Sequence, residues 1–334
     1  MNLNGWLREH TYHHSQFEDL ERLVELKEEQ DETITVSLPT LNEEETIAKE
    51  LILIQSELME KYPLVDEIAV VDSGSDDRTR EIAREYGASV FLAENHLTDH
   101  GVYQGKGENL WKTLYLLDGD IIVYLDADIK NIDPKFVYGL VGPLLERPEL
   151  GYVKAFYERP LDVGDDRRTS GGGRVTEILV RPLLNLFFPD LGGMIQPLSG
   201  EYAGRRSVLE RLPFFIGYGV ETGLLIDIQE QFGMDCVAQV DLDRRVHENQ
   251  DLQSLGRMAF GILQTFFNRV EEAGKIDLIQ EIRSNFRTIV SSGEEFDLEE
   301  HDLREVERPP MLDVPQYRDR HGRSSLPEAI ESSS

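Results

Sequence analysis

The sequence predicts an α/β fold in which helices cover both faces of a mostly parallel sheet. Short, uniformly apolar segments alternate with helical segments over residues 33–155, which is the pattern of parallel strands joined by crossover helices. Polar side chains directly follow three of these apolar segments. Because the ligands of such sheets bind beyond the carboxyl ends of the strands, these side chains predict a binding site along one rim.

Each strand–helix unit carries turn chemistry that marks its boundaries. In the first unit we expect Asn42 to be the N-cap of a helix that runs to about residue 61, with Glu45 as its capping-box partner. The second unit repeats the order of strand, polar turn, helix and terminal glycine. A later helix begins near Pro134, a residue suited to a first helical turn. The segments read as strands are TITVSL, DEIAVVD, ASVFLA, DIIVYL and GYVKAFY.

The second half of the chain departs from this alternation. A glycine run at 171–173 precedes a helical segment, and CVAQVDL reads as one more strand before RRVHEN. Residues 252–290 have helical character, and from about residue 291 the composition turns polar, as in a flexible tail. We therefore expect a helical arm at 1–32, two central halves at 33–155 and 156–255, helices at 256–290 and a tail at 291–334.

A net charge of −30 over 334 residues argues against several kinds of partner. Such a surface repels nucleic acid and anionic lipid. The single cysteine, Cys236, rules out an intrachain disulfide and fits a reducing cytoplasm. The N-terminal stretch has no apolar signal-peptide block, and no apolar run reaches the ~18 residues of a membrane helix. We expect a cytoplasmic protein without a membrane segment.

Two carboxylates end the strand IIVYL: Asp126 and Asp128, separated by Ala127. Carboxylates held this close repel each other and lose hydration unless a cation lies between them. A hard divalent ion such as Mg²⁺ or Mn²⁺ takes oxygen ligands and also neutralises phosphates. The alternative is a solvated loop start, because aspartate is common after strands. The position within a β/α pattern favours the metal.

Two turns and one lysine are candidates for holding a nucleotide. Asn42 and Ser73 follow strands, where exposed backbone N–H groups and short polar side chains suit a base and ribose, although helix capping explains each of them alone. Lys106 lies between two glycines at a helix start and can reach a phosphate or a base edge. The alternative is a solvated surface lysine. The segment lacks the glycine spacing and the hydroxyl of a P-loop.

Candidates for binding an anion and a sugar come from the second half. The glycines at 171–173 offer backbone amides, and Arg174 and Thr176 add a guanidinium and a hydroxyl. The alternative is a flexible linker. In GYGVE, Tyr218 and Glu221 can contact a sugar, or simply begin a helix.

Two further polar residues follow the strand CVAQVDL. His247 can complete a metal site with Asp128, or be an ordinary polar residue, and Asn249 lies two positions beyond it.

These segments together resemble the retaining glucosyl-3-phosphoglycerate synthases, whose family includes the mannosyl-3-phosphoglycerate synthases. The resemblance covers residues from about 33 to 247 and somewhat beyond. PTLNEE, VDSGSDD, GKGE and DAD are shared with many glycosyltransferases of the GT-A fold. GGGRVTE, QPLSGEYAG and GYGVE are far more specific to this family, and RPLL and HEN also match it.

The resemblance implies a GT-A fold, a Rossmann-like, mostly parallel sheet with a C-terminal acceptor-binding region. It implies a nucleotide-sugar donor, a divalent metal (Mg²⁺ or Mn²⁺), 3-phosphoglycerate as acceptor and a homodimer. Residues 33–155 become the donor half and 156–255 the acceptor half. The implied donor-binding residues are Pro39, Leu41, Asn42, Glu43, Ser73, Lys106, Asp126, Ala127, Tyr218 and Glu221. The implied acceptor-binding residues are Gly171, Gly172, Gly173, Arg174, Val175, Thr176 and Asn249.

The implied metal ligands are Asp128 and His247, and the catalytic candidates are Glu221 and Asp128. Two positions depart from the family: Ala127 stands where a serine is frequent, and Gln250 where an arginine is frequent, which puts phosphate contacts in doubt. Arg244 or Arg245 can compensate for the missing arginine.

The implied reaction moves glucose from a nucleotide-glucose, UDP-glucose first, to 3-phosphoglycerate. Its product leads towards the compatible solute glucosylglycerate. The alternatives are a mannosyl-3-phosphoglycerate synthase using GDP-mannose, a polymer-forming transferase of the same fold, and a non-catalytic nucleotide-sugar binding protein.

Overall fold

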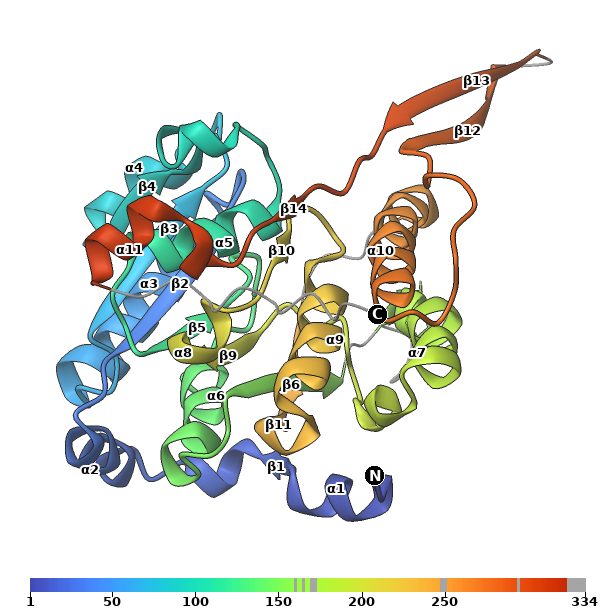
Figure 1. Cartoon of the computed structure of the whole chain (residues 1–334). Coiled ribbons are helices and arrows are strands. Elements are labelled where there is room, and N and C mark those ends of the chain that lie inside the picture. Colours follow the sequence, from blue (N-terminus) through green and yellow to red (C-terminus); the bar gives the residue numbers. More distant parts are fainter. Residues whose placement is uncertain (159–160, 164–165, 169–172, 247–250, 293–294, 323–334) are drawn as a thin grey trace.

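An eight-stranded, mostly parallel sheet forms the centre of the molecule in the computed structural model (Figure 1). The structure describes residues 1–158, 161–163, 166–168, 173–246, 251–292 and 295–322. The strand order is β1-β11-β6-β9-β5-β2-β3-β4, and only β9 runs antiparallel to its two neighbours. The strands are β1 (Thr11–His13), β2 (Ile34–Thr40), β3 (Glu67–Asp72), β4 (Ser89–Leu92), β5 (Ile121–Tyr124), β6 (Tyr152–Glu158), β9 (Tyr202–Arg205) and β11 (Val237–Arg244). The expected fold class is confirmed.

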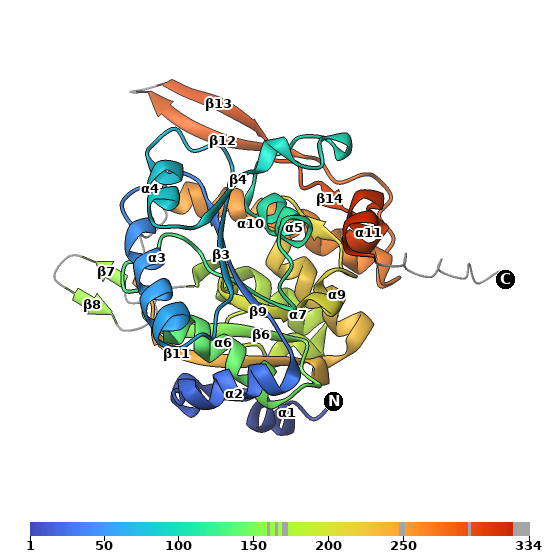
Figure 2. The same cartoon turned by 90° about the vertical axis from the view of Figure 1, so that its left-hand side faces the viewer.

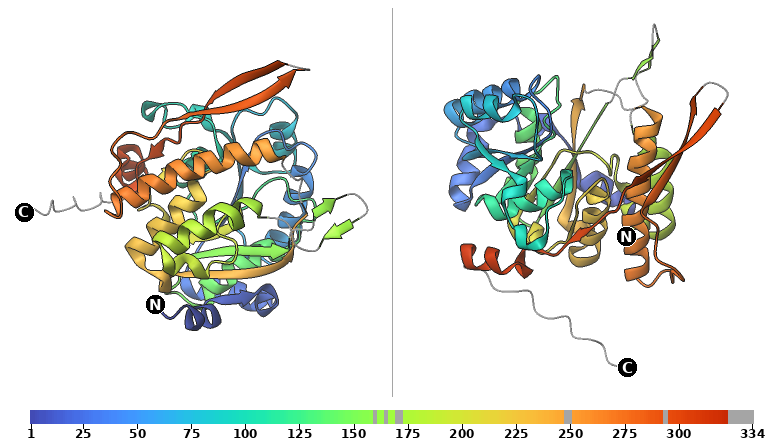
Figure 3. Two further views of the ribbon diagram at one scale, coloured as in Figure 1. Left: turned by 90° about the vertical axis from the view of Figure 1, so that its right-hand side faces the viewer. Right: turned by 90° about the horizontal axis from the view of Figure 1, so that it is seen from above.

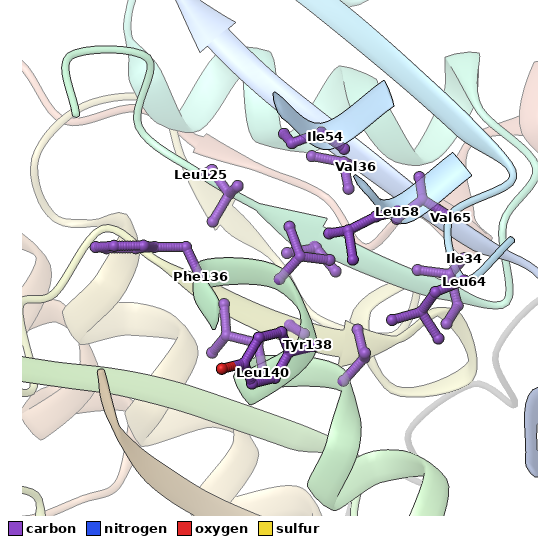
Figure 4. Close-up of a cluster of buried hydrophobic side chains, with 14 of the residues drawn as sticks. Ile34, Val36, Ile54, Leu58, Leu64, Val65, Leu125, Phe136, Tyr138 and Leu140 are labelled. Carbon is purple, nitrogen blue, oxygen red and sulfur yellow. The ribbon is translucent and has the colours of Figure 1, made fainter. Parts of the chain in front are cut away.

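Helices cover both faces of this sheet, as the uniformly apolar strands predict. Along β5, Ile121 and Val123 belong to one hydrophobic core, whereas Ile122 and Tyr124 belong to the other. The first core is closed by α2 (Leu20–Gln30), α3 (Ile47–Gln55), α4 (Thr79–Glu85) and α6 (Lys135–Glu146). Figure 4 shows part of it, with Leu58, Leu125 and Phe136 packed between the sheet and these helices.

The second core lies on the opposite face and contains most of the C-terminal half. Its helices are α1 (Leu3–Glu9), α5 (Lys106–Leu116), α7 (Arg181–Phe187), α8 (Arg206–Leu209), α9 (Val220–Phe232), α10 (Leu252–Glu272) and α11 (Pro315–His321). Figure 3 shows α10 beside α7 and α9. Short π-helical turns extend α3 at Ser56–Lys61 and precede α7 at Thr176–Val180.

Residues 1–32 are less uniformly helical than the sequence suggests. Between α1 and α2 the three residues of β1 pair with β11 and complete the edge of the sheet. A strand this short, made of Thr, Tyr and His, has no apolar pattern by which it could be recognised. Trp6 and Phe17 are buried on either side of β1, so the segment is part of the body rather than a free arm.

The C-terminal region also differs from the expected helices and flexible tail. α10 ends at Glu272, and a hairpin of β12 (Asn285–Ser292) and β13 (Glu295–Asp302) projects from the body (Figures 1 and 2). The chain then returns as β14 (Glu307–Arg308), which pairs with β10 (Phe214–Phe215), and ends in α11. A second small hairpin joins β7 (Leu161–Val163) to β8 (Asp166–Arg168). The prediction was wrong because a polar composition also fits an exposed hairpin. Beyond the hairpin the chain packs onto the body, where Tyr317 of α11 is fully buried.

Among the residues described, no helix has the length and apolarity needed to cross a membrane.

Arg206 ties the C-terminal helix to the core through hydrogen bonds to main-chain oxygens. Its buried guanidinium donates to the carbonyls of Leu114, Leu117 and Gly119 at 2.7–2.8 Å, and lies 3.4 Å from the Tyr317 hydroxyl. Two of these carbonyls belong to the C-terminal turn of α5, where helices leave acceptors unpaired.

We predict that Arg206→Met lowers the free energy of unfolding by about 3 kcal/mol, because buried carbonyls lose their donors. The measurement is urea denaturation. Arg211→Met is the matched control, since Arg211 is exposed and lies 5.4 Å from the Phe232 ring; its expected cost is below about 1 kcal/mol. Equal losses in the two variants would contradict this account.

Candidate functional site

A cavity of about 510 Å³ opens where β2, β3 and β5 end, which is within the range of small-ligand pockets. The three strands are parallel neighbours, so their carboxyl ends share one rim. The far wall comes from Arg257 and Gly261 of α10 and from residues 302–305. The expected donor residues that line the cavity are Pro39, Leu41, Glu43, Ser73, Lys106, Asp126, Ala127 and Tyr218. The expected metal ligand Asp128 also lines it, whereas Asn42 and Glu221 do not.

The two aspartates after β5 converge on a single cationic nitrogen. One terminal nitrogen of Arg245 lies 3.1 Å from the Asp126 carboxylate and 2.6 Å from that of Asp128. Burial raises the pKa of Asp128, and Arg245 opposes that shift while Asp126 adds to it. Asp128 keeps 39% of its side chain exposed towards the cavity. Two carboxylates that already share one cationic group have the donor chemistry for Mg²⁺ or Mn²⁺.

Lys106 joins the aspartate pair to Glu221. Lys106 is the first residue of α5, and Glu221 lies in the first turn of α9. The Lys106 ammonium lies 2.6 Å from the Asp126 carboxylate and 2.9 Å from that of Glu221. Burial lowers the pKa of Lys106, but the charges of Asp126 and Glu221 outweigh it and raise the pKa overall. The lysine is therefore a fixed positive charge on the cavity floor, not a solvated surface residue.

The glycines on both sides of Lys106 allow close packing against the segment that carries Tyr218. Gly105 has φ 149°, and a side chain at Gly105 or Gly107 would collide with the carbonyls of Ile216 and Phe215. The Glu108 amide donates to the Ile216 carbonyl at 3.2 Å. Lys106 and Tyr218 therefore reach the same cavity because the two main chains touch.

Asn42 has a different role from the one expected. It is not the N-cap of α3, whose N-cap is Thr46. It adopts φ 61°, and its side-chain oxygen accepts from the Asp76 amide at 2.9 Å, which joins the two strand-end turns. Its neighbour Glu43 lines the cavity, and burial together with the charge of Asp128 raises its pKa to about 7. Ser73 accepts a 2.8 Å hydrogen bond from Asn109 of α5.

The expected acceptor loop is described only in part. Gly173, Arg174, Val175 and Thr176 lead into α7, with Gly173 at φ 88° and Thr176 buried. Gly171, Gly172, Asn249, Gln250 and the expected metal ligand His247 lie outside the described residues.

Sequence reasoning missed two buried residues that organise the site. Arg245 is 3% exposed, and its Nε lies 2.7 Å from the carboxylate of Glu201, which is fully buried. Burial raises the pKa of Glu201, and Arg245 opposes the shift. The motif QPLSGEYAG contained Glu201 without an assigned role, and Arg245 was expected only to compensate for the arginine missing at position 250, not to pair with the aspartates.

A different group of side chains could hold a metal by proximity alone. Among the described residues, His13, His14 and Asp243 bring their ligand atoms within 4.8 Å of one another. The Asp243 carboxylate already accepts from both imidazoles and from Lys135, the last at 2.6 Å. These contacts make the cluster an ionic link between β1 and β11.

Comparison with known proteins agrees with this geometry. Glycosyl transferase family 2 matches residues 35–213. A glucosyl-3-phosphoglycerate synthase of Petrotoga mobilis is 56% identical over 310 residues, which cover 93% of this chain and 95% of that protein. The Mycobacterium tuberculosis enzyme of the same name is 48% identical over 240 residues, covering 71% and 73% of the two chains.

The chain belongs to glycosyl transferase family 2 and, within it, to the glucosyl-3-phosphoglycerate synthase family.

Solved structures of the family superpose on the whole fold. A mannosyl-3-phosphoglycerate synthase from Rubrobacter xylanophilus has a TM-score of 0.85 at 36% identity, covering 92% of this chain and 97% of that one. The M. tuberculosis glucosyl-3-phosphoglycerate synthase, solved with Mn²⁺, UDP and glucosyl-3-phosphoglycerate, has a TM-score of 0.76 at 40% identity, covering 87% and 94%. The same enzyme was also solved with Mn²⁺ and UDP-glucose, and with Mg²⁺ and UDP.

Lys154 of β6 is buried beneath this site. Its ammonium lies 3.3 Å from the Tyr152 hydroxyl and 4.6 Å from the centre of the Tyr202 ring. Burial lowers its pKa to about 7, and the charge of Glu221 opposes the shift only in part. The folded state therefore prefers a neutral amine, whereas the unfolded chain holds a protonated one up to its ordinary value of 10.5.

We predict that stability rises with pH between about 7 and about 10 by up to ~1.4 kcal/mol per pH unit, because the unfolded state binds one more proton. Lys154→Met should remove this slope and raise the free energy of unfolding at neutral pH. Denaturant unfolding across the range measures both effects. Lys61→Met, at an exposed lysine, is the control and should keep the wild-type slope. An unchanged slope in Lys154→Met would refute the assignment.

Proposed function

We propose that this chain is a metal-dependent retaining glucosyltransferase that moves glucose from UDP-glucose to 3-phosphoglycerate and yields glucosyl-3-phosphoglycerate. The observation that carries the proposal is that Asp126, Asp128 and Lys106 line one cavity at the strand ends, with the buried Arg245 paired to both aspartates. Relatives at 56% and 48% identity are named glucosyl-3-phosphoglycerate synthase, and the M. tuberculosis enzyme was solved with UDP-glucose and Mn²⁺.

The cavity would stabilise a leaving diphosphate by positive charge. Asp128 and His247 would hold Mg²⁺ or Mn²⁺, which supplies Lewis-acid stabilisation of the departing phosphate. Lys106 adds a positive charge that is fixed by Asp126 and Glu221 before the donor arrives. Such preorganised charges stabilise the transition state without the cost of reorientation.

The remaining cavity residues would select and orient the donor. Pro39, Leu41 and Ser73 would hold the nucleoside, while Tyr218 and Glu221 would contact the glucose. Glu221 and Asp128 remain our catalytic candidates. The Glu221 carboxylate lies 2.9 Å from the Lys106 ammonium. This contact fixes the carboxylate in place, which supports a role in accepting hydrogen bonds from sugar hydroxyls.

The acceptor is an anion and needs a local basic site in a protein with a net charge of −30. Arg174, Thr176 and the amides of the glycine run supply the groups for it, and the family resemblance adds Asn249. Their place at the start of the segment leading into α7 supports this assignment.

One assay separates this proposal from its rivals. Purified protein is mixed with donor, metal and 3-phosphoglycerate, and release of free nucleoside diphosphate is followed with UDP-glucose and with GDP-mannose. We expect acceptor-dependent release from UDP-glucose. Release only from GDP-mannose would indicate a mannosyl enzyme, and binding without release would indicate a non-catalytic protein.

We predict that Asp128→Ala lowers transfer at least about 1,000-fold and removes its metal dependence, because the cation loses a carboxylate ligand. Rates at increasing Mn²⁺ measure both effects. Asp133→Ala is the matched control, since Asp133 is exposed in the same loop and its carboxylate accepts a 3.0 Å hydrogen bond from the Lys135 amide; it should retain transfer. Undiminished wild-type activity in chelator would overturn the metal's role.

We also propose that the protein is a homodimer in the cytoplasm, and the β12–β13 hairpin supports a self-association surface. Register places Ile289 opposite Leu298, with Phe296 on the same face, and the three are 60–76% exposed. Phe286 on the other face packs against Phe260 of α10. A two-stranded hairpin is marginally stable alone, so an apolar outer face favours burial against a second copy.

We predict that Ile289→Glu combined with Leu298→Glu shifts the protein from dimer to monomer, because both charges would be buried at the interface. Light scattering after size exclusion measures the mass. Glu299→Ala, on the opposite face of the hairpin, should remain dimeric. A monomeric wild-type protein would exclude the dimer.

A further inference from the structure

The segment that returns from the hairpin to β14 crosses both elements that carry the expected donor contacts. We define residues 302–308 as the C-terminal strap. Its β14 pairs with β10, immediately before the Gly217–Gly219 turn, and the Ile216 amide donates to the Val306 carbonyl at 3.0 Å. Residues 302–305 also line the cavity. The strap lies beyond residues 35–213, which match the glycosyl transferase family 2 model.

Arg308 attaches the strap to the helix that begins with Lys106. Its guanidinium makes a bidentate pair with Glu108 of α5, with both distances at 2.6 Å, and both side chains are buried. Lys112 lies 2.9 Å from the same carboxylate. The glutamate of the GKGE motif therefore anchors the strap, and this end of the strap is rigid.

Glu305 attaches the strap to the turn that carries Tyr218. Its carboxylate accepts from the Gly217 amide at 3.0 Å and also from the amides of Tyr218 and Gly219. Three successive amides around one carboxylate form an anion-binding nest at the start of α9. Burial raises the pKa of Glu305, and the three amides oppose that shift.

The surrounding residues are shaped to admit this carboxylate. A side chain at Gly217 or Gly261 would occupy the position of the Glu305 carboxylate. Gln264 of α10 holds the strap on both sides of Arg304, by donating to the Leu303 carbonyl at 2.7 Å and accepting from the Glu305 amide at 3.4 Å. The turn, the helix and the strap thus specify one position for the carboxylate.

We propose that Glu305 is a positioning residue for the donor sugar: it fixes the Gly217–Gly219 turn so that Tyr218 faces the cavity and Glu221 stays beside Lys106. The inference rests on the proposed function, in which these two residues contact glucose. Tyr218 is 48% exposed, and its side chain makes no hydrogen bond to the described residues, so its position depends on the main chain beneath it. Gly217 and Gly219 alone would leave that main chain free to move.

The test compares UDP-glucose with UDP, because only the first has the sugar. In Glu305→Ala we expect the affinity for UDP to change less than about twofold and kcat/KM for UDP-glucose to fall about 10- to 100-fold, as misplacement of a contact does. KM for 3-phosphoglycerate should stay within about twofold. Formate, a small carboxylate that fits the vacated nest, should restore part of the loss in Glu305→Ala but not affect the wild type.

Glu305→Gln keeps the shape and carries the test should the alanine variant not fold. The glutamine's amide oxygen can accept a hydrogen bond from the nest, but its NH₂ group is repelled by the main-chain N–H groups. We therefore expect kcat/KM for UDP-glucose to lie between the values of the wild type and Glu305→Ala. Glu307→Ala is the matched control on the same strap, because Glu307 pairs with Arg269, which retains Asp227 and Glu272; it should match the wild type.

The proposal is overturned if Glu305→Ala keeps wild-type kcat/KM, or if UDP and UDP-glucose lose affinity equally. A wild-type protein that transfers nothing would instead overturn the proposed function. In that case the binding measurements still test the role of Glu305, because they compare the ratio of the affinities for UDP-glucose and UDP between the wild type and the variants.

Discussion

Charge compensation at the carboxyl end of β5 is the constraint on which the site depends. Four carboxylates meet at the partly buried floor of the cavity, those of Asp126, Asp128, Glu201 and Glu221. Arg245 and Lys106 form ion pairs with them. An unpaired buried carboxylate costs several kcal/mol, so the two cations have to be present for the floor to fold. Lys106 lines the cavity and Arg245 is buried against the two aspartates, so the pairing that stabilises the fold also places positive charge at the proposed diphosphate site.

The fold brings these charges together through close approach of main chains. Glycines at 105 and 107 let α5 touch the turn after β10, and the parallel register of β2, β3 and β5 aligns their ends. The C-terminal strap then joins both sides through Glu108 and Glu305. The strand ends and the C-terminal strap therefore share one cavity, and the strap supplies part of its far wall together with α10.

The sequence alone predicted much of this arrangement for a physical reason. Uniformly apolar strands such as IIVYL require cover on both faces, and the period of the pattern placed Asp126 and Asp128 at a strand end. The sequence predicted secondary structure less well where its local pattern carries no information. β1 has three residues, β9 runs antiparallel within a glycine-containing segment, and the exposed hairpin is polar enough to resemble a tail.

By itself, the sequence determined the fold class, the strand-end location of the site and the residues of the donor cavity that follow directly on strands. Only the tertiary structure decided which charges meet. Arg245 lies 117 positions from Asp128, and Glu305 lies 88 positions from Gly217, and no periodicity along the chain encodes such pairs. Burial makes these distant pairings obligatory, because a charge removed from water requires a partner wherever the fold can supply one.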